Sequence, residues 1–236
     1  MFRALTGGLS PAESVVIWNI RLPRIVTAVV VGWGLALSGL GIQSLLKNPL
    51  GSPSTLGISQ GAAFGAASAI VLFSGRVVSV TAMAFAGAMA ATGIILMLAR
   101  LRRLTAEAVI LAGVALSSLF ASATILIQYL ATETQLAVVV FWTFGDVARS
   151  NWRDIGLMTA AVAGVSLFFM VRRWDLNALA SGEETARGLG VNVERIRIQG
   201  MVAASLVAAL ATAFCGVIAF VGLIAPHMAQ IGRAHV

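Results

Sequence analysis

The sequence predicts an all-α protein that crosses a membrane several times. Hydrophobic residues make up 59% of its 236 residues and charged residues only 11%. That composition leaves too little polar surface to cover a soluble globule of this size. Charge-free apolar runs recur along the chain, and several are long enough to cross the roughly 30 Å hydrocarbon core of a bilayer as a helix. The chain therefore belongs in a membrane.

Six charge-free runs mark the expected spans, at residues 25–46, 56–75, 77–99, 108–132, 155–171 and 198–232. Each of the first five can form one helix. The sixth is too long for one crossing and contains Pro226, which predicts a helix, a break and the start of another helix. At least six spans are therefore expected. Gly75 and Arg76 predict a tight hairpin, whereas residues 133–154 form a longer connection whose apolar part, 136–144, is too short to cross.

The basic residues of the loops predict the orientation. One loop holds Arg100, Arg102 and Arg103, and another, two spans later, holds Arg172, Arg173, Arg187, Arg195 and Arg197. Both loops should therefore be cytoplasmic. Alternation then places Lys47 inside and Arg21 and Arg24 outside. An outward N-terminus without a signal peptide is unusual, so we expect a further helix to precede this chain in the complete protein.

The last six residues, 231–236, match the translation of a common sequencing-adapter sequence. We therefore expect residues 1–230 to form a single, partial transmembrane domain and 231–236 to be a non-native tail, which leaves Arg233 and His235 outside any functional argument. An ordinary short basic tail is the alternative.

Two glycine–proline pairs suggest an internal repeat. Gly39 precedes Pro49 by ten residues, and Gly216 precedes Pro226 by the same distance. Each pair closes an apolar run, and the two runs cross in opposite directions. Broken helices at matching places of two halves are typical of inverted-topology repeats in transporters.

Small residues line one face of the second run. Gly57, Gly61 and Gly65 are spaced by four and therefore lie on one side of a helix. Such a face allows two helix backbones to approach closely in lipid, so we expect helix packing there and not a ligand site.

Other function classes find less support in the residues. The net charge of +7 comes from arginines between apolar runs, which does not indicate a nucleic-acid partner. Cys215 is the only cysteine, which excludes a disulfide framework and a cysteine metal site. Residues 57–61 match G-x-S-x-G, so an intramembrane serine protease with Ser59 as nucleophile and His227 as base is a remote alternative.

The source of energy is the next question. The apolar runs contain no Asp, Glu, Lys or Arg, and His227 is their only titratable residue apart from Cys215 and Tyr129. Ion-coupled transport needs an ionisable group within the membrane, so any driving force should come from elsewhere. Residues 172–197 offer a route: Glu183 and Glu184 open a short helix that Gly188 and Gly190 close. That helix is either a solvated surface element or the docking element for a soluble partner.

Seven ordered blocks together resemble the permease family of ABC importers for iron-siderophores, haem and vitamin B12. The blocks are Arg21-Leu22-Pro23-Arg24; Gln43 with Asn48-Pro49-Leu50; Leu56-Gly57-Ile58-Ser59-x-Gly61-Ala62; Leu111-Ala112-Gly113-Val114-Ala115-Leu116; Trp142 with Gly145; Leu179-x-x-Gly182-Glu183-Glu184-x-Ala186-x-x-Leu189-Gly190-Val191; and Gly216-x-Ile218-x-Phe220-Val221-Gly222-Leu223-Ile224-x-Pro226-His227.

The resemblance implies a type II ABC importer permease with ten helices in two inverted-repeat halves, of which this chain would lack the first helix and the last few. It also implies a multi-pass protein of the bacterial inner membrane that pairs with a second permease subunit, identical or not. Two cytoplasmic ATPase subunits would bind ATP and Mg²⁺, and an extracytoplasmic binding protein would deliver the substrate. The chain itself would hold no cofactor or metal and would not be an enzyme; it carries no P-loop motif.

The resemblance also implies roles for individual residues. Arg21 and Arg24 would dock the binding protein, and Asn48 and Leu50 would project from the proline-bounded turn to line the inner gate. The coupling element that contacts the ATPase would consist of Gly182, Glu183, Ala186, Leu189 and Gly190, with Ala186 and Leu189 on one face toward the partner. Pro49, Gly57, Gly61, Gly216, Gly222, Pro226 and His227 would be structural. A ferric siderophore is the expected substrate, with haem or cobalamin as alternatives.

Overall fold

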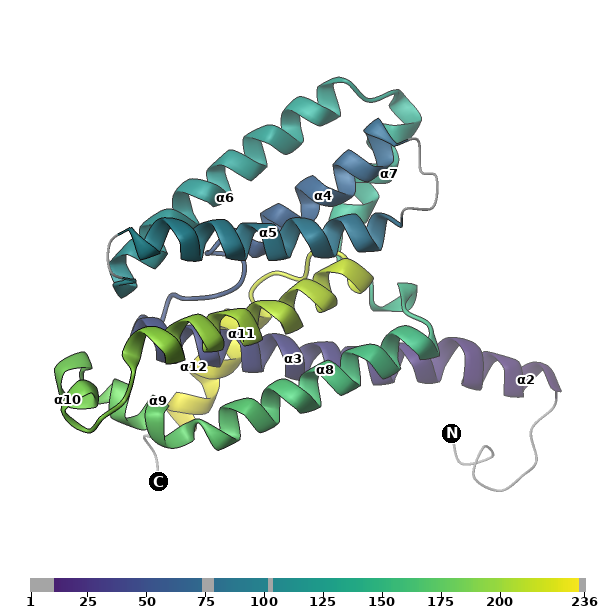
Figure 1. Cartoon of the computed structure of the whole chain (residues 1–236). Helices are drawn as coiled ribbons and strands as arrows, with labels where there is room; N and C mark the ends of the chain where they lie inside the picture. Colours follow the sequence, from purple (N-terminus) through teal and green to yellow (C-terminus); the bar gives the residue numbers. More distant parts are fainter. Residues whose placement is uncertain (1–10, 74–78, 102–103, 234–236) are drawn as a thin grey trace.

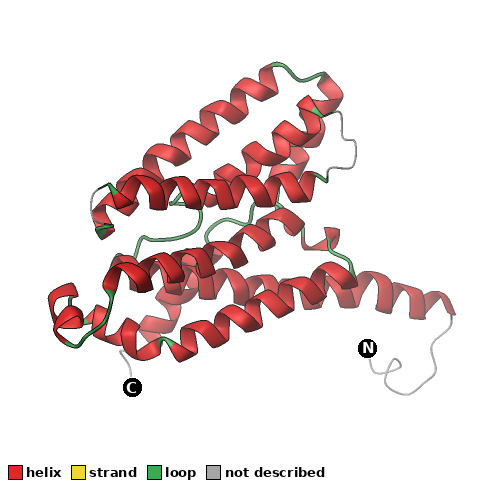
Figure 2. Ribbon diagram, in the orientation of Figure 1, coloured by secondary structure: helices red, strands yellow, loops and turns green. Residues whose placement is uncertain are grey.

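The computed structural model describes residues 11–73, 79–101 and 104–233, and every regular element in these ranges is a helix (Figures 1 and 2). The elements are α2 (Pro11–Val16), the π-helix η1 (Ile17–Arg21), α3 (Leu22–Leu46), α4 (Ile58–Leu72), α5 (Val80–Arg100), α6 (Ala106–Tyr129), α7 (Glu133–Thr143), the 3-10 turn η2 (Val147–Arg149), α8 (Trp152–Val171), α9 (Arg173–Ala180), α10 (Glu183–Gly188), α11 (Val193–Cys215) and α12 (Val221–Arg233).

Within the described ranges, five helices are long and apolar enough to cross a membrane: Ala12–Leu46, Val80–Arg100, Ala106–Tyr129, Trp152–Val171 and Val193–Cys215. The run at 56–75 differs from the prediction, because its helix α4 has only 15 residues. At 1.5 Å per residue it is about 22 Å long, shorter than the hydrocarbon core. The expected hairpin at Gly75 and Arg76 lies outside the described residues. Helix α7, at 11 residues, is too short to cross, as predicted.

The last apolar run contains a helix, a break and a second helix, as predicted, but the break is not at the proline. Helix α11 ends at Cys215, and Gly216 and Phe220 have positive φ angles of 76° and 66°. Pro226 instead lies inside α12. The chain reverses at Gly216 because glycine adopts positive φ without steric penalty.

The N-terminal span runs without interruption from α2 through η1 into α3 and extends beyond the other helices (Figure 1). Its π-turn lies directly before Pro23. Leu22 N–H donates to the carbonyl of Ile17, five residues back. Pro23 has no N–H to continue this pattern to Trp18. The indole N–H of Trp152, at the start of α8, donates to the Trp18 carbonyl instead, at 3.2 Å.

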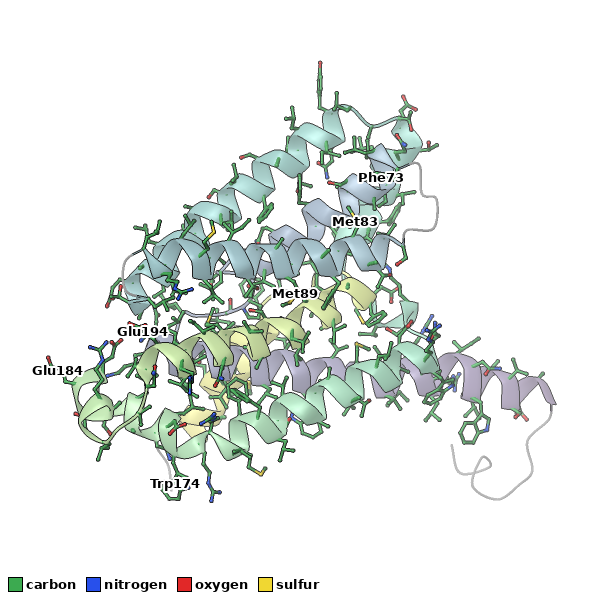
Figure 3. All side chains as sticks on the ribbon, viewed as in Figure 1. Phe73, Met83, Met89, Trp174, Glu184 and Glu194 are labelled. Carbon is green, nitrogen blue, oxygen red and sulfur yellow. The ribbon has the colours of Figure 1, made fainter. Side chains whose placement is uncertain are left out.

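The helices form two groups that meet along α11 (Figure 1). Helices α4, α5 and α6 pack on one another, and α3 and α8 pack on α11, which also packs on α4 and α5, while α12 packs on α3. Within the first group, a Cβ atom on Gly61 would lie 2.6 Å from the carbonyl oxygen of Gly87, and one on Gly65 would overlap that of Met83 (Met83 is labelled in Figure 3). The predicted small-residue packing is therefore confirmed for Gly61 and Gly65, with α5 as the partner, whereas Gly57 lies before α4 and faces Ser117 of α6.

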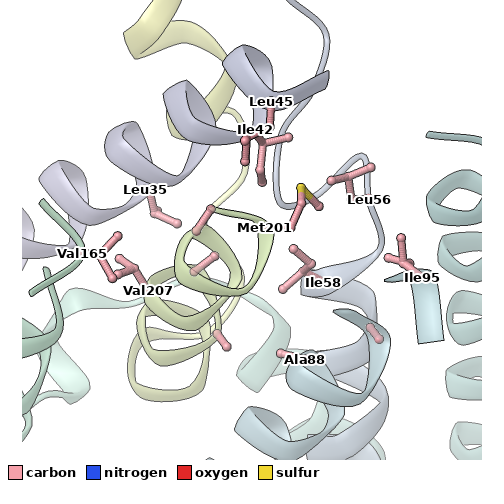
Figure 4. Packing of buried hydrophobic residues seen from close by; sticks show 14 of the residues in the cluster. Leu35, Ile42, Leu45, Leu56, Ile58, Ala88, Ile95, Val165, Met201 and Val207 are labelled. Atoms are coloured by element: carbon pink, nitrogen blue, oxygen red, sulfur yellow. The ribbon is translucent and has the colours of Figure 1, made fainter. Parts of the chain in front are cut away.

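Buried apolar side chains of α3, α4 and α11 meet in the hydrophobic core (Figure 4). Ile42, Leu45 and Ile58 are fully buried there, next to Met201 at 1% exposure. A Cβ atom on Gly200 would lie 2.6 Å from Leu45 Cδ1, so α11 approaches α3 closely at this level. The packing fixes the end of α3, from which the chain continues into the turn at residues 47–57.

Candidate coupling and gating site

Residues 47–57, which we call the gate turn, leave α3 through a left-handed residue. Lys47 has φ 49°, and the N–H of Asn48 donates to the carbonyl of Gln43 at 3.2 Å. Asn48 Oδ1 accepts the N–H of Leu50 at 2.9 Å. The side chain of Asn48 therefore stabilises its own turn. The sequence analysis had expected this side chain to project from the turn. Leu50 does project, with 68% of its surface exposed.

The second half of the gate turn is buried and held by its own hydrogen bonds. The N–H of Ser52 donates to Thr55 Oγ1 at 2.9 Å, and the N–H of Ile58 donates to the carbonyl of Pro53 at 3.0 Å. Gly57, at φ 79°, leads into α4, and a Cβ atom there would lie 3.0 Å from the backbone nitrogen of Ser117. The turn is thus anchored at both ends, while Pro49 and Leu50 at its tip are exposed.

The gate turn faces the helix that leads into the coupling segment. An open groove separates the two, lined by Gln43, Ser44, Lys47, Asn48 and Pro49 on one side and by Leu176, Asn177 and Ala180 of α9 on the other. The predicted gate and the predicted coupling element, more than 120 residues apart in sequence, therefore lie at the same end of the molecule.

Two glycines shape the coupling segment as predicted. Gly182 has φ 130° at the start of α10, and Gly190 has φ 84° after its end. The N–H of Ala186 donates to the carbonyl of Gly182, and the N–H of Val191 returns to the carbonyl of Ala186, each at 2.9 Å. A side chain at either glycine would be strained, since L-residues rarely adopt these angles.

The expected common face of Ala186 and Leu189 is wrong. Ala186 is fully buried in the core of this chain, whereas Leu189 is 70% exposed. Leu189 follows the end of α10, so the helical spacing of three residues no longer applies to it. Ala186 therefore anchors α10 from within, and a partner would meet Leu189 and the outward side of α10, which carries Glu184 (Figure 3).

Glu183 also faces inward, toward an arginine that the sequence analysis had assigned to a loop. Arg197 lies in α11 and is 1% exposed. Its Nη2 donates to Glu183 Oε1 at 2.5 Å, its Nε to the carbonyl of Leu45 at 3.3 Å, and its Nη1 to the carbonyl of Leu104. Glu183, which the resemblance places in the element that contacts the ATPase, thus meets a basic group of its own chain.

A sequence signal for Arg197 exists. It lies on the buried face of α11 together with Val193, Gly200 and Ala204, at spacings of three and four residues. Because the predicted run began after the last charged residue, Arg197 was excluded from the helix. A charged residue in phase with an apolar face is the pattern that would have identified it.

The same contacts bring the expected cytoplasmic segments together. Arg197 contacts three of these segments. Leu45 lies in the last turn of α3, Leu104 lies between α5 and α6, and Glu183 is the first residue of α10. The alternation of loops derived from the charges is therefore consistent with the packing. Which side of the membrane this end faces stays a prediction.

The opposite end holds the other predicted residues. Arg21 and Arg24 are exposed, Arg21 on the π-turn and Arg24 on the first turns of α3. Gly145 packs on the break between α11 and α12, since a Cβ atom there would lie 2.7 Å from the carbonyl oxygen of Val217. Two of the seven sequence blocks thus meet in space.

The arrangement of Ser59 and His227 does not form a catalytic pair. Ser59 is buried at the start of α4, whereas His227 is exposed on α12, which packs on α3. In the described part of the chain no hydrogen bond joins the two side chains, so the geometry needed to activate a serine is not present.

Comparison with known proteins identifies the family. A model of the FecCD transport family matches residues 1–235. The chain belongs to the FecCD transport family. A protein described as an ABC transporter permease of Methanocaldococcus jannaschii is 51% identical over 240 residues, covering 97% of this chain and 69% of its own length. The cobalamin import system permease protein BtuC of Halobacterium salinarum is 36% identical and covers 95% of this chain and 61% of its own length.

The fold of this FecCD-family chain is also that of a solved transporter. A structure described as an inward-facing conformation of a metal-chelate type ABC transporter superposes with a TM-score of 0.85 at 33% identity, covering 94% of this chain and 71% of the other. The resemblance found in the sequence is confirmed, and the chain is an all-helical, multi-pass membrane protein with the fold of an ABC importer permease. The chain spans 61–69% of the length of these two curated relatives.

Proposed function

We propose that this chain forms the translocation pathway of an ATP-driven importer for a metal chelate, most specifically a ferric siderophore. The observation that carries the proposal is the placement of the coupling segment at the same end as the gate turn: α9, which leads into α10, lines a groove with the gate turn, and α10 itself has an exposed outer side and a buried inner side. Membership of the FecCD family supports the same function.

The ATPase would bind the outer side of α10. Leu189 is 70% exposed, next to Gly188 and Gly190, which leave room for a partner surface. A short helix in a groove transmits rigid-body motion if its other side is fixed to the remainder of the permease. Ala186 and Glu183 supply that fixation here.

Leu50 would line the inner gate. Its apolar side chain projects from a turn that is anchored at both ends. Two copies of Leu50 that face each other across a two-fold axis could therefore close a passage by contact of their apolar side chains. At the other end, the exposed Arg21 and Arg24 would meet acidic residues of the binding protein.

The substrate is proposed from the family and from the solved transporter. A metal chelate is the cargo class named for that structure, and a ferric siderophore is a member of this class. Cobalamin, named for one relative, and haem are the alternatives. A multi-pass location in a bacterial inner membrane, and a complex with a second permease subunit, two ATPase subunits and a binding protein, belong to the same proposal.

Uptake into proteoliposomes tests the function. The complete permease would be reconstituted with its ATPase subunits and binding protein, and uptake of a ⁵⁵Fe-siderophore would be compared with uptake of haem and of cobalamin. We expect uptake that requires ATP and the binding protein, and that is fastest for the siderophore. Uptake of haem or cobalamin alone would overturn the substrate assignment, and ATP-independent or absent uptake of all three would overturn the function.

A further inference from the structure

Arg197 is a buried cation at the junction of three separate segments. A guanidinium group removed from water is unfavourable unless acceptors compensate it. The acceptors of Arg197 come from residues 152, 93 and 14 positions away in sequence: the carbonyls of Leu45 and Leu104 and the carboxylate of Glu183. Each of the three belongs to a different segment at the α10 end of the molecule.

The two carbonyls belong to places where the chain leaves a helix. Leu45 lies in the last turn of α3, whose carbonyls lack helical partners, and the gate turn begins two residues later. Leu104 follows α5 with φ 52°, and its N–H donates back to the carbonyl of Ala99 at 2.9 Å. Cationic donors are favourable at helix C-termini. Arg197 therefore fixes the end of α3 and the α5–α6 connection to α11.

The third acceptor is the first residue of α10. Glu183 and Arg197 approach to 2.5 Å, and the guanidinium group offers its donors in a rigid planar fork. Movement of α10 relative to α3 would have to break a buried, charge-assisted hydrogen bond. Arg187 approaches the other oxygen of Glu183 only to 3.9 Å and is 60% exposed, so it contributes little.

We propose that Arg197 is a positioning residue that makes α10 and the gate turn move as one body, so that displacement of α10 by the ATPase is transmitted to Leu50. The proposal rests on the proposed function for its direction, from ATPase to gate. It goes beyond the family's coupling element by assigning the transmission to a residue of α11 that contacts neither partner nor substrate.

The test uses the complete importer in proteoliposomes with three variants. Arg197→Lys keeps the charge, but one ammonium group cannot reach three acceptors that are now bonded by three different nitrogens. Arg197→Met removes the charge at similar length, and Arg195→Met, at an exposed arginine of the same helix, is the matched control. We expect uptake per ATP hydrolysed to fall about tenfold in both Arg197 variants, within the range of allosteric coupling, and to stay unchanged in Arg195→Met.

A distance measurement separates transmission from simple stability. Spin labels at the exposed positions 50 and 189, each paired with its counterpart in the second subunit, would be followed through the nucleotide cycle. In the unmodified importer both distances should change together. In Arg197→Lys the distance at 189 should still respond to ATP, while the distance at 50 should not. If both distances still change together, or if uptake per ATP is normal, the proposal is overturned.

The outcome also distinguishes this proposal from the proposed function. If Arg197→Met fails to assemble, Arg197→Lys and Glu183→Gln, which keeps a side-chain acceptor, decide by the same two measurements. An importer without ATP-driven uptake in unmodified form would contradict the proposed function, whereas the label distances would still decide whether Arg197 joins α10 to the gate turn.

Discussion

Gly39 and Gly222 lie in backbone contact where α3 crosses α12, because a Cβ atom on Gly39 would overlap the carbonyl oxygen of Gly222. Pro226, four residues after Gly222, has no N–H with which to bond that oxygen in the usual helical pattern. The sequence analysis paired Gly39 with Gly216 as repeat equivalents. The structure adds a contact between Gly39 and Gly222, and Gly222 lies in the last of the motif blocks together with Pro226.

Replacing Gly39 by alanine should therefore separate the two helices. We expect Gly39→Ala to lower stability by about 1–3 kcal/mol, as in overpacked cores, and to lower the melting temperature in detergent. Gly32→Ala is the matched control, since a Cβ atom at Gly32 meets nothing within 4 Å and alanine favours a helix. Equal melting temperatures of the two variants would contradict the close crossing.

Trp152 should hold the π-turn in place. Trp152→Phe keeps an aromatic ring but removes the donor to the Trp18 carbonyl. We expect a loss of about 0.5 kcal/mol in local stability, seen as faster hydrogen exchange of residues 17–22. Trp174→Phe, at a tryptophan that is 71% exposed and stacks on Arg173, should leave that exchange unchanged. Unchanged exchange in Trp152→Phe would show that the indole is not needed.

Arg21 and Arg24 should affect docking and not folding. Changing both to glutamate should weaken association of the binding protein about tenfold at low salt, and the difference should shrink as salt screens the charges. Arg153→Glu, at an exposed arginine of the same end, controls for a charge reversal at that end and is compared with each single variant, Arg21→Glu and Arg24→Glu. Association that is insensitive to the double change would assign the two arginines to lipid anchoring.

Substitutions of Leu189 and Ala186 should have different effects, the first on ATPase binding and the second on stability. Leu189→Asp should weaken ATPase binding about tenfold without lowering the melting temperature, because a polar group would replace an exposed apolar contact. Ala186→Leu should instead destabilise the permease by about 1–3 kcal/mol, because no space surrounds a fully buried alanine. Co-purification and melting curves measure both. Normal ATPase binding in Leu189→Asp would remove α10 as the docking element.

Leu50 should lie near its counterpart across the two-fold axis. Leu50→Cys should crosslink to its counterpart under oxidising conditions in at least one nucleotide state. If the second permease subunit is a different chain, a cysteine is also placed at its equivalent position. Leu101→Cys is the control: Leu101 is also exposed, at 80%, but it lies at the end of α5 and should not crosslink. No crosslink from position 50 in any nucleotide state would exclude Leu50 from the gate.

The sequence predicted the helices well, because bilayer thickness requires apolar runs of a fixed length. It failed where local geometry decides. The last break is at Gly216 and not at Pro226, since a positive φ ends a helix more sharply than a proline in one of its early turns. Helix α4 begins two residues later than its apolar run because Gly57 still belongs to the gate turn.

The coupling segment was located correctly, but its inner and outer sides were not. Helical spacing indicates which residues share a face, and α10 is too short for that rule to reach Leu189. The partner of Glu183 was missed for another reason: charge was used to mark the ends of spans, so Arg197 could not be counted inside one. The packing of α11 shows that Arg197 is enclosed, as its position on the apolar face of that helix would have indicated.

The backbone contact between α4 and α5 makes these two helices a fixed reference for measuring motion within the molecule. Side chains can change rotamer to let two helices slide, but Gly61 and Gly65 leave no side chains between the two backbones. Probes attached to the outer faces of these two helices should keep a constant separation throughout a transport cycle. Displacements of other helices could then be expressed against that pair, so that the moving parts are distinguished from rotation of the whole subunit.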